Sequence, residues 1–279
     1  MKTLHKIVLT VFGWSLIWIS LADAGEARKR ISSTANDYSN LSDIEAEIRF
    51  GRDLSARILG NYKLLKDEKK NKYIGLIGTG LSRYAGRPEL KFYFGILETD
   101  EINAFAAPGG YVFITTGALA EMENEAQLAA VLSHEIAHVV KRHVVKKLNI
   151  KGDQGSATGG FASMIGGATG SFREAFEHSL LEAEEILFKK GYKIEEEIEA
   201  DQFGILLASA AGYSPDALRD FLIKCKRFES GNPKADSEHP PHEIRIQKMN
   251  ETLQAEGLHN GSNAKIRNRF YDYIQKQNP

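Results

Sequence analysis

Two histidines and a glutamate lie within five consecutive residues, His134-Glu135-Ile136-Ala137-His138. On a helix, residues four positions apart lie on the same face, so both imidazoles can reach one ion. Neutral imidazole nitrogens suit zinc, and a bound zinc ion lowers the pKa of water toward about 7. A neighbouring carboxylate can then take a proton from that water as it attacks a carbonyl. The pattern therefore predicts a hydrolytic zinc site with Glu135 as its base.

The residues around this motif favour a metal site over a chance match. Apolar residues precede the motif, from Leu128 to Leu132, and Val139 and Val140 follow it, so the helix is predicted to be buried. Two histidines and a glutamate would be costly in such a helix if they had no partners. We therefore expect one Zn2+ per chain, bound by His134 and His138.

A catalytic zinc ion usually has three protein ligands and one open position, so a third ligand must come from elsewhere. The best candidate is Glu197, because Asp201 lies one helical turn further along the same face and can hydrogen-bond a ligand imidazole. Spacing alone does not choose among Glu197 and its neighbours Glu195, Glu196 and Glu199. The alternative for these neighbours is a solvated acidic face.

Composition excludes several classes of protein. The chain has 279 residues, with 36 Lys and Arg against 37 Asp and Glu, and the net charge of −1 gives no reason to expect nucleic-acid binding. Hydrophobic residues make up 42% of the chain, which is ordinary for a globular protein and excludes a disordered chain. The single cysteine, Cys225, excludes an intrachain disulfide, and a small buried hydrophobic residue is favoured over a redox role there.

The N-terminus has the layout of a secretory signal peptide. Lys2 and Lys6 precede fifteen largely apolar residues, Ile7 to Leu21, and Ala22-Asp23-Ala24 then forms a small-x-small cleavage site. Because about 20 apolar residues are needed to span a bilayer, cleavage after residue 24 is favoured over a retained anchor. No cysteine stands near position 25, so the chain is not expected to be a lipoprotein.

The spacing of apolar residues predicts an α+β fold, with two helices, a few strands and then helices to the end. The predicted helices span residues 43–66, 72–85, 124–147, 173–190, 194–211 and 214–228, and the predicted strands span residues 91–97, 103–106 and 111–115. Residues 25–40 are expected to form a flexible lead-in and residues 41–279 a single domain. The stretch 152–171, rich in Gly, Ala and Ser, is interpreted as a mobile loop or a closely packed helix, and alternatively as a lid or membrane-touching segment.

Several motifs together resemble the gluzincin zinc metallopeptidases of the HtpX and CaaX-prenyl-protease type, with a closer likeness to soluble periplasmic members of the BepA and LoiP kind. The motifs are EIRFGR at 47–52, NAFAAPGG at 103–110, TGAL at 116–119, HEIAH at 134–138, EIEAD at 197–201 and HPP at 239–241, with Arg245. The resemblance covers most of the chain after residue 24. It implies a mainly helical, zincin-like domain with a small β-sheet beside the HEIAH helix.

The resemblance also implies roles for individual residues. His134, His138 and Glu197 match the zinc ligands of the family, Glu135 matches its catalytic base, and Asp201 matches the acidic residue that supports the site.

Other histidines divide into one with a match and several without. His239 matches a residue that in some relatives approaches the zinc ion and holds the enzyme latent, and the alternative is an ordinary loop histidine. His143, His178, His242 and His259 have no match and are interpreted as surface or helix-end histidines.

A strand beside the metal can pair with an extended peptide through main-chain hydrogen bonds. We therefore expect substrate to contact Asn103, Ala104, Phe105, Gly109 and Gly110. The alternative for this region is a purely structural hairpin.

These observations lead to the expectation of a periplasmic zinc endopeptidase that acts on unfolded or misassembled envelope proteins. Its other expected contact is peripheral, with the membrane or the outer-membrane assembly machinery. One alternative is an assembly factor or chaperone with little or latent proteolysis, and another is a structural protein with a closed metal site. The sequence leaves open the cleavage preference, the oligomeric state and the group that stabilises the oxyanion.

Overall fold

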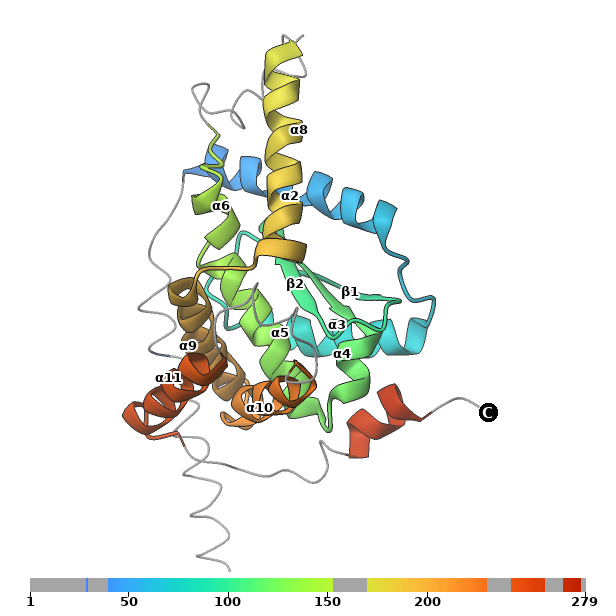
Figure 1. Ribbon diagram of the computed structural model, residues 1–279, viewed down its shortest axis with the longest axis vertical. Coiled ribbons are helices and arrows are strands. Elements are labelled where there is room, and N and C mark those ends of the chain that lie inside the picture. The colour runs from blue at the N-terminus through green and yellow to red at the C-terminus, as the bar shows by residue number, and fades with distance from the viewer. Residues whose placement is uncertain (1–28, 30–39, 153–169, 230–241, 259–267, 277–279) are drawn as a thin grey trace, which may run out of the picture.

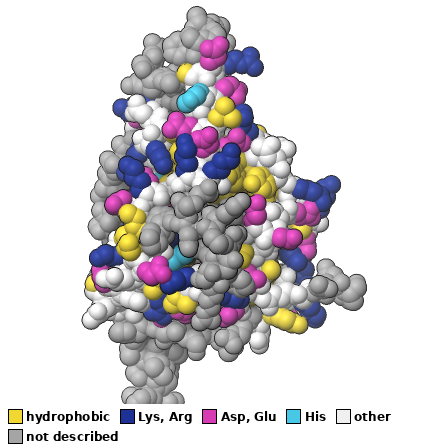
Figure 2. Space-filling view, in the orientation of Figure 1, with side chains coloured by type: hydrophobic (Ala, Val, Ile, Leu, Met, Phe, Trp, Pro, Cys, Tyr) yellow, Lys and Arg dark blue, Asp and Glu magenta, His cyan; other side chains and the backbone are white. Residues whose placement is uncertain are grey.

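The computed structural model describes residues 29, 40–152, 170–229, 242–258 and 268–276 (Figure 1). The predicted signal peptide, most of the lead-in, His239, His259 and nearly all of the Gly-rich stretch lie outside the described residues. Within the described part, no helix is both long and apolar enough to cross a membrane. On the face drawn in Figure 2, Lys and Arg side chains are interspersed with Asp and Glu side chains.

A small mixed sheet forms the middle of the fold. Its strands are β1 (Tyr93–Leu97), β2 (Ala104–Ala107) and β3 (Tyr111–Thr115), in the order β1-β3-β2. Strand β3 runs parallel to β1 and antiparallel to β2, so β2 is an edge strand. A 3-10 turn, Pro108–Gly110, joins β2 to β3, and its two glycines have φ values of 74° and 95° that side chains with a Cβ rarely adopt.

Alternate residues of the strands face two different cores because successive side chains in a strand point to opposite faces. Ile96 and Ile114 pack in the larger core with α3 (Glu68–Ser82), while Phe105 and Phe113 pack in the second core with α2 (Leu41–Asn61). Helix α8 (Gly170–Glu185) completes the second core and continues into a π-helical turn, η2 (Ile186–Lys190).

Helix α5 (Glu125–Val140) carries the HEIAH motif and lies between the sheet and α9 (Ile194–Ala210), as Figure 1 shows. It begins at Asn124, whose side chain accepts a hydrogen bond from the backbone N–H of Gln127. Nearly every residue of α5 is buried, which explains its lack of a polar face.

The prediction of one helix over 124–147 is wrong. The chain adopts the left-handed conformation at Arg142, with φ 59°, and a separate short helix, α6 (His143–Lys147), follows. This change of direction brings His143 back toward α5.

The other described helices pack on different elements. Helix α10 (Ala217–Glu229) packs on α5, and α11 (His242–Ala255) packs on α9 and α10. Helix α4 (Thr116–Glu121) contacts β3, and the terminal turn η4 (Tyr271–Gln275) contacts α3. The α+β prediction of a mainly helical domain with a small sheet beside the HEIAH helix is confirmed. Helix α4 was not predicted, and the observed helix boundaries differ from the predicted ones by a few residues.

Candidate metal site

The site is built on two helices that approach each other closely. Helix α5 contributes His134, Glu135 and His138, and α9 contributes Glu197. The helices can meet here because α9 carries Gly204, where a Cβ atom would lie only 3.0 Å from the Cα atom of His134. A larger residue at this position would push the two halves of the site apart.

His134, His138 and Glu197 are buried, and each offers one ligand atom to a cluster spanning no more than 4.8 Å. The Nε2 atoms of the histidines are 3.0 Å apart, and Glu197 oxygens lie 3.5 Å from His134 Nε2 and 3.8 Å from His138 Nε2. Ligand atoms about 2.0–2.1 Å from a tetrahedral zinc ion would lie about 3.3 Å apart. The donor types and their spacing therefore fit a zinc ion.

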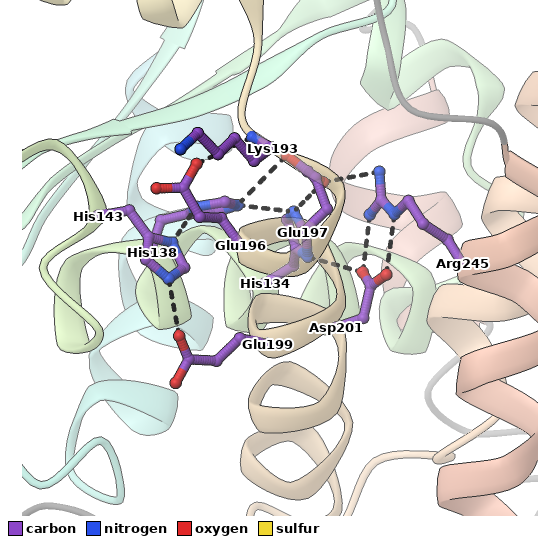
Figure 3. Close-up of polar contacts among 9 residues, drawn as sticks. All are labelled: His134, His138, His143, Lys193, Glu196, Glu197, Glu199, Asp201 and Arg245. Atoms are coloured by element: carbon purple, nitrogen blue, oxygen red, sulfur yellow. Dashed lines mark hydrogen bonds and ion pairs between the residues drawn. The ribbon is translucent and has the colours of Figure 1, made fainter. Parts of the chain in front are cut away.

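Asp201 and Arg245 support this cluster from one side (Figure 3). Asp201 Oδ1 lies 2.9 Å from His134 Nδ1, the nitrogen that faces away from the cluster. Arg245, on α11, donates two hydrogen bonds to Asp201 at 2.7 and 2.8 Å and lies 2.8 Å from a Glu197 oxygen. The guanidinium therefore balances two buried carboxylates.

The carboxylates and burial act in opposite directions on the two histidines. Burial alone would lower the pKa of His134, but hydrogen bonds and charge from Asp201 and Glu197 outweigh it and raise the pKa to about 10. Burial and the neighbouring charge of His134 hold the pKa of His138 well below its ordinary value. Without a cation, His134 is therefore protonated and His138 is neutral at pH 7.

The acids of the site also differ from one another. Burial would raise the pKa of Glu197 and of Asp201, but the charge of Arg245 outweighs it, so both groups have lowered pKa values. Burial raises the pKa of Glu135 to about 7, although the charge of His134 opposes this. A carboxylate with a pKa near the working pH can both accept and donate a proton, as a general base and acid must.

The second histidine has supporting partners of its own. His138 Nδ1 lies 2.8 Å from His143 Nδ1, and His143 Nε2 lies 3.1 Å from a Glu199 oxygen. The ring of Tyr192 stacks on His138 with centroids 4.0 Å apart. Of the two positions expected for His143, the surface position is wrong, since only 3% of this residue is exposed, whereas the helix-end position is confirmed, since His143 begins α6. Glu199 is not simply part of a solvated acidic face, because it contacts His143 and pairs with Lys141.

A cleft of about 380 Å³ opens at the cluster, and His134, Glu135, His138 and Glu197 all line it. Its apolar wall comes from α4, α5, η2 and α10 and includes Ala118, Val131, Ile186, Leu187, Leu218, Phe221 and Leu222. Cys225 also lines the cleft and is partly exposed, which differs from the buried position expected for it.

The expected substrate-binding residues divide into two groups. Asn103, Ala104 and Phe105 line the cleft beside the cluster. Gly109 and Gly110 are buried at the turn, where a Cβ would collide with backbone near Ile48 of α2 or near Lys91, and they are not among the described residues that line the cleft.

Sequence reasoning missed the contacts of Arg245 and His143. Arg245 appeared in the sequence as part of a motif, but nothing in its spacing indicated that it would reach Asp201. His143 lies five residues after His138, a separation that points to a different face in a continuous helix. The helix ends at the left-handed residue Arg142, which turns His143 back toward His138, and only the structure shows this.

Comparison with known proteins agrees with this geometry. The model of peptidase family M48 matches residues 68–253. The β-barrel assembly-enhancing protease of Escherichia coli (strain K12) is 29% identical over 239 residues, which are 81% of this chain and 47% of that protein. The protein of the same name from Yersinia pestis is 30% identical over 217 residues, which are 73% of this chain and 43% of that protein.

A mitochondrial relative matches as well. The mitochondrial metalloendopeptidase OMA1 of Schizosaccharomyces pombe is 27% identical over 229 residues, which are 81% of this chain and 64% of that protein. The chain thus spans about half the length of the bacterial relatives that it matches. These matches confirm the family resemblance indicated by the motifs.

Proposed function

Because the chain belongs to peptidase family M48, we propose that it hydrolyses internal peptide bonds with a zinc ion held by His134, His138 and Glu197. The observation that carries this proposal is the meeting of two imidazoles and a carboxylate from separate helices at the wall of an open cleft. The open cleft favours a catalytic site over a closed structural one, because a catalytic zinc ion needs a free coordination position.

The side chains divide the chemistry among them. A zinc ion, when bound, supplies Lewis-acid polarisation of the scissile carbonyl and acidifies water. Glu135 accepts the proton of the attacking water and returns it to the leaving amine, a task for a carboxylate that lines the cleft beside the cluster. Asp201 orients the His134 ring through Nδ1, so that Nε2 faces the cation.

Strand β2 is proposed to bind the substrate backbone. The Asn103 carbonyl accepts a hydrogen bond from the Thr115 N–H at 3.0 Å, so the alternation of an antiparallel ladder directs the backbone groups of Ala104, which lines the cleft, away from β3. An extended peptide could pair with these groups and present its carbonyl to the cluster. Such pairing contacts main-chain atoms of the substrate. It favours unfolded segments, because their backbone groups are free to pair.

The proposed setting is the periplasm, with unfolded or misassembled envelope proteins as substrates. Two observations support it: the signal-like N-terminus, Lys2 to Ala24, and the name of the bacterial relatives, β-barrel assembly-enhancing protease. The words "assembly-enhancing" in that name favour one other function, assistance to β-barrel assembly in which cleavage plays little part. In that case the cleft would bind unfolded chains without turning them over.

The test of the proposed activity measures metal content and cleavage together. The purified chain should contain about one zinc ion, as expected for a single three-ligand site, and should cleave unfolded casein until a chelator is added. Glu135→Gln should keep the zinc ion and lose about 100-fold or more of the cleavage rate, because it removes the general base. A zinc-free wild type, or full cleavage by Glu135→Gln, would contradict the proposal.

A genetic experiment separates the two functions. If proteolysis is the function, Glu135→Gln should fail to complement a strain that lacks the gene. Full complementation by this variant would instead favour an assembly role. His178→Gln, an exposed change on α8, is the matched control and should complement fully.

A further inference from the structure

Each cluster histidine has one nitrogen facing the cluster and one facing the protein. For His134 the protein-facing partner is the carboxylate of Asp201. For His138 it is another imidazole, because His138 Nδ1 and His143 Nδ1 are 2.8 Å apart. The two rings stand nearly perpendicular, with an interplanar angle of 74°, and both residues are buried.

We propose that His143 is a positioning residue for the metal site, which fixes the ring of His138 by accepting its Nδ1 proton. This inference rests on the proposed zinc site and assigns the orientation of its second ligand to a residue outside the EIEAD and HEIAH motifs. His143 does not reach the cluster itself, so its influence passes through His138.

Proton positions along this chain follow from the chemistry of metal binding. A zinc ligand needs an unprotonated nitrogen, so His138 must leave Nε2 bare and carry its proton on Nδ1. His143 must then accept at Nδ1 and carry its own proton on Nε2. That proton has an acceptor, since a Glu199 oxygen lies 3.1 Å away. The reverse arrangement would protonate Nε2 of His138 and prevent metal binding.

The surroundings hold this chain of groups in place. The ring of Tyr192 stacks on His138 and lies 5.7 Å from the His143 ring, so it covers the two imidazoles. Glu199 is partly exposed and is held from the other side by Lys141, 3.0 Å away. The left-handed residue Arg142 sets the direction in which His143 returns to α5. Figure 3 shows the resulting line from His138 through His143 to Glu199.

The first test compares zinc affinities, measured by competition with a fluorescent chelator. His143→Leu keeps an apolar side chain of similar size but removes the acceptor, and it should weaken zinc binding about 10–100-fold. In His143→Asn, the side-chain oxygen occupies nearly the position of Nδ1, so most of the affinity should return. His178→Leu, at an exposed histidine, should bind zinc as the wild type does.

The comparison separates this inference from the proposed function. A wild type that does not bind zinc contradicts the zinc site itself. Tight binding by wild type and equally tight binding by His143→Leu contradicts only the role of His143. Equal losses in the Leu and Asn variants also overturn it, since a purely structural role would not distinguish an acceptor from an apolar group.

A second test needs no variant and therefore does not depend on folding of a mutant. Long-range 1H-15N NMR of the zinc-bound wild type should show His143 with its proton on Nε2 and His138 with its proton on Nδ1. A proton on Nδ1 of His143 would overturn the proposal.

Discussion

Arg245 is the residue on which the charge balance of the site depends. It lies within 2.8 Å of both Glu197 and Asp201, and its side chain is only 12% exposed. Two buried carboxylates close together would repel each other without this guanidinium. The arginine thus keeps both acids ionised in a metal-free chain, ready to receive a cation.

Removing Arg245 should therefore be costly. Arg245→Met should lower the free energy of unfolding by about 3–5 kcal/mol in chelator, because it leaves two buried carboxylates with only the charge of His134 to balance them. Urea unfolding measures this loss, which should shrink when zinc is bound, since the cation then balances Glu197. The control Arg52→Met removes a side chain that is 62% exposed and should cost about 1 kcal/mol or less. Equal losses in the two variants would contradict the prediction.

The raised pKa of His134 predicts proton release on metal binding. At pH 8 the metal-free His134 is protonated, because its pKa is about 10. Since a ligand imidazole must be neutral, zinc binding should release about one proton from it, and the affinity should rise with pH up to about pH 10. Calorimetry in buffers of different ionisation enthalpy counts these protons. Asp201→Asn removes the main cause of the raised pKa, so fewer protons should be released.

The sequence predicted the three proposed zinc ligands better than it predicted the residues that hold them in place. The i, i+4 spacing of His134 and His138 is a property of any helix, so their shared face could be predicted. Glu197 could only be proposed, because helix geometry does not tell which glutamate of α9 faces α5. The partners Arg245 and His143 could not be predicted, since their contacts depend on how α11 and α6 pack. The ligand roles themselves stay predictions until metal is measured.

At the scale of elements, the site depends on how closely α5 and α9 approach. Glycine is unfavourable in a helix interior by about 1 kcal/mol relative to alanine, so Gly204 weakens α9 locally. The contact explains it, since a Cβ there would lie 3.0 Å from backbone atoms of His134. Glycine at this position therefore lowers the helix propensity of α9 but lets α9 approach the proposed ligand His134.

Gly204→Ala should therefore destabilise the fold by about 1–3 kcal/mol and weaken zinc binding, because backbone atoms of α5 must move. Gly75→Ala is the matched control, since Gly75 lies in the interior of α3 with no heavy atom near its added Cβ. This control should stabilise the protein by up to about 1 kcal/mol. Thermal unfolding and zinc competition measure both variants. Stabilisation by Gly204→Ala would contradict the close-contact explanation.

The elements themselves were largely predictable where apolar spacing was regular. The strands were predicted almost at their observed positions because β1 and β3 are rich in aromatic and β-branched residues and because the Pro108–Gly110 turn separates β2 from β3. The end of the helix before Arg142 could not be predicted. Arginine gives no signal for a left-handed residue, and the apolar pattern continues into Val144 and Val145. The parallel pairing of β1 with β3 was also not predicted, since it depends on tertiary packing.

At the scale of the whole molecule, the beginning of α5 is tied to the last described segment. Glu125, fully buried, accepts hydrogen bonds from Tyr73 at 2.5 Å and Tyr213 at 2.9 Å and pairs with Arg269. Its negative charge also lies at the N-terminus of α5, where the helix dipole favours it. Three distant parts of the chain therefore fix the start of the helix that carries the HEIAH motif.

Phe270, next to Arg269, is completely buried, so the last described segment should contribute to global stability. Phe270→Ala should lower the free energy of unfolding by about 3–5 kcal/mol through the cavity that it leaves. Its neighbour Tyr271 is 54% exposed, and Tyr271→Ala should change stability by about 0.5 kcal/mol or less. Urea unfolding measures both values. A small effect of Phe270→Ala would mean that the segment is not packed in solution.

The division of the site between α5 and the later helices α9 and α11 has a consequence for biosynthesis. A growing polypeptide exposes His134 and His138 well before Glu197, Asp201 and Arg245 have been translated. At synthesis rates of about 5–20 residues per second, several seconds pass between the translation of His138 and that of Glu197. A half-made chain therefore lacks Glu197, Asp201 and Arg245, and the proposed metal site can assemble only after residue 245 has been translated.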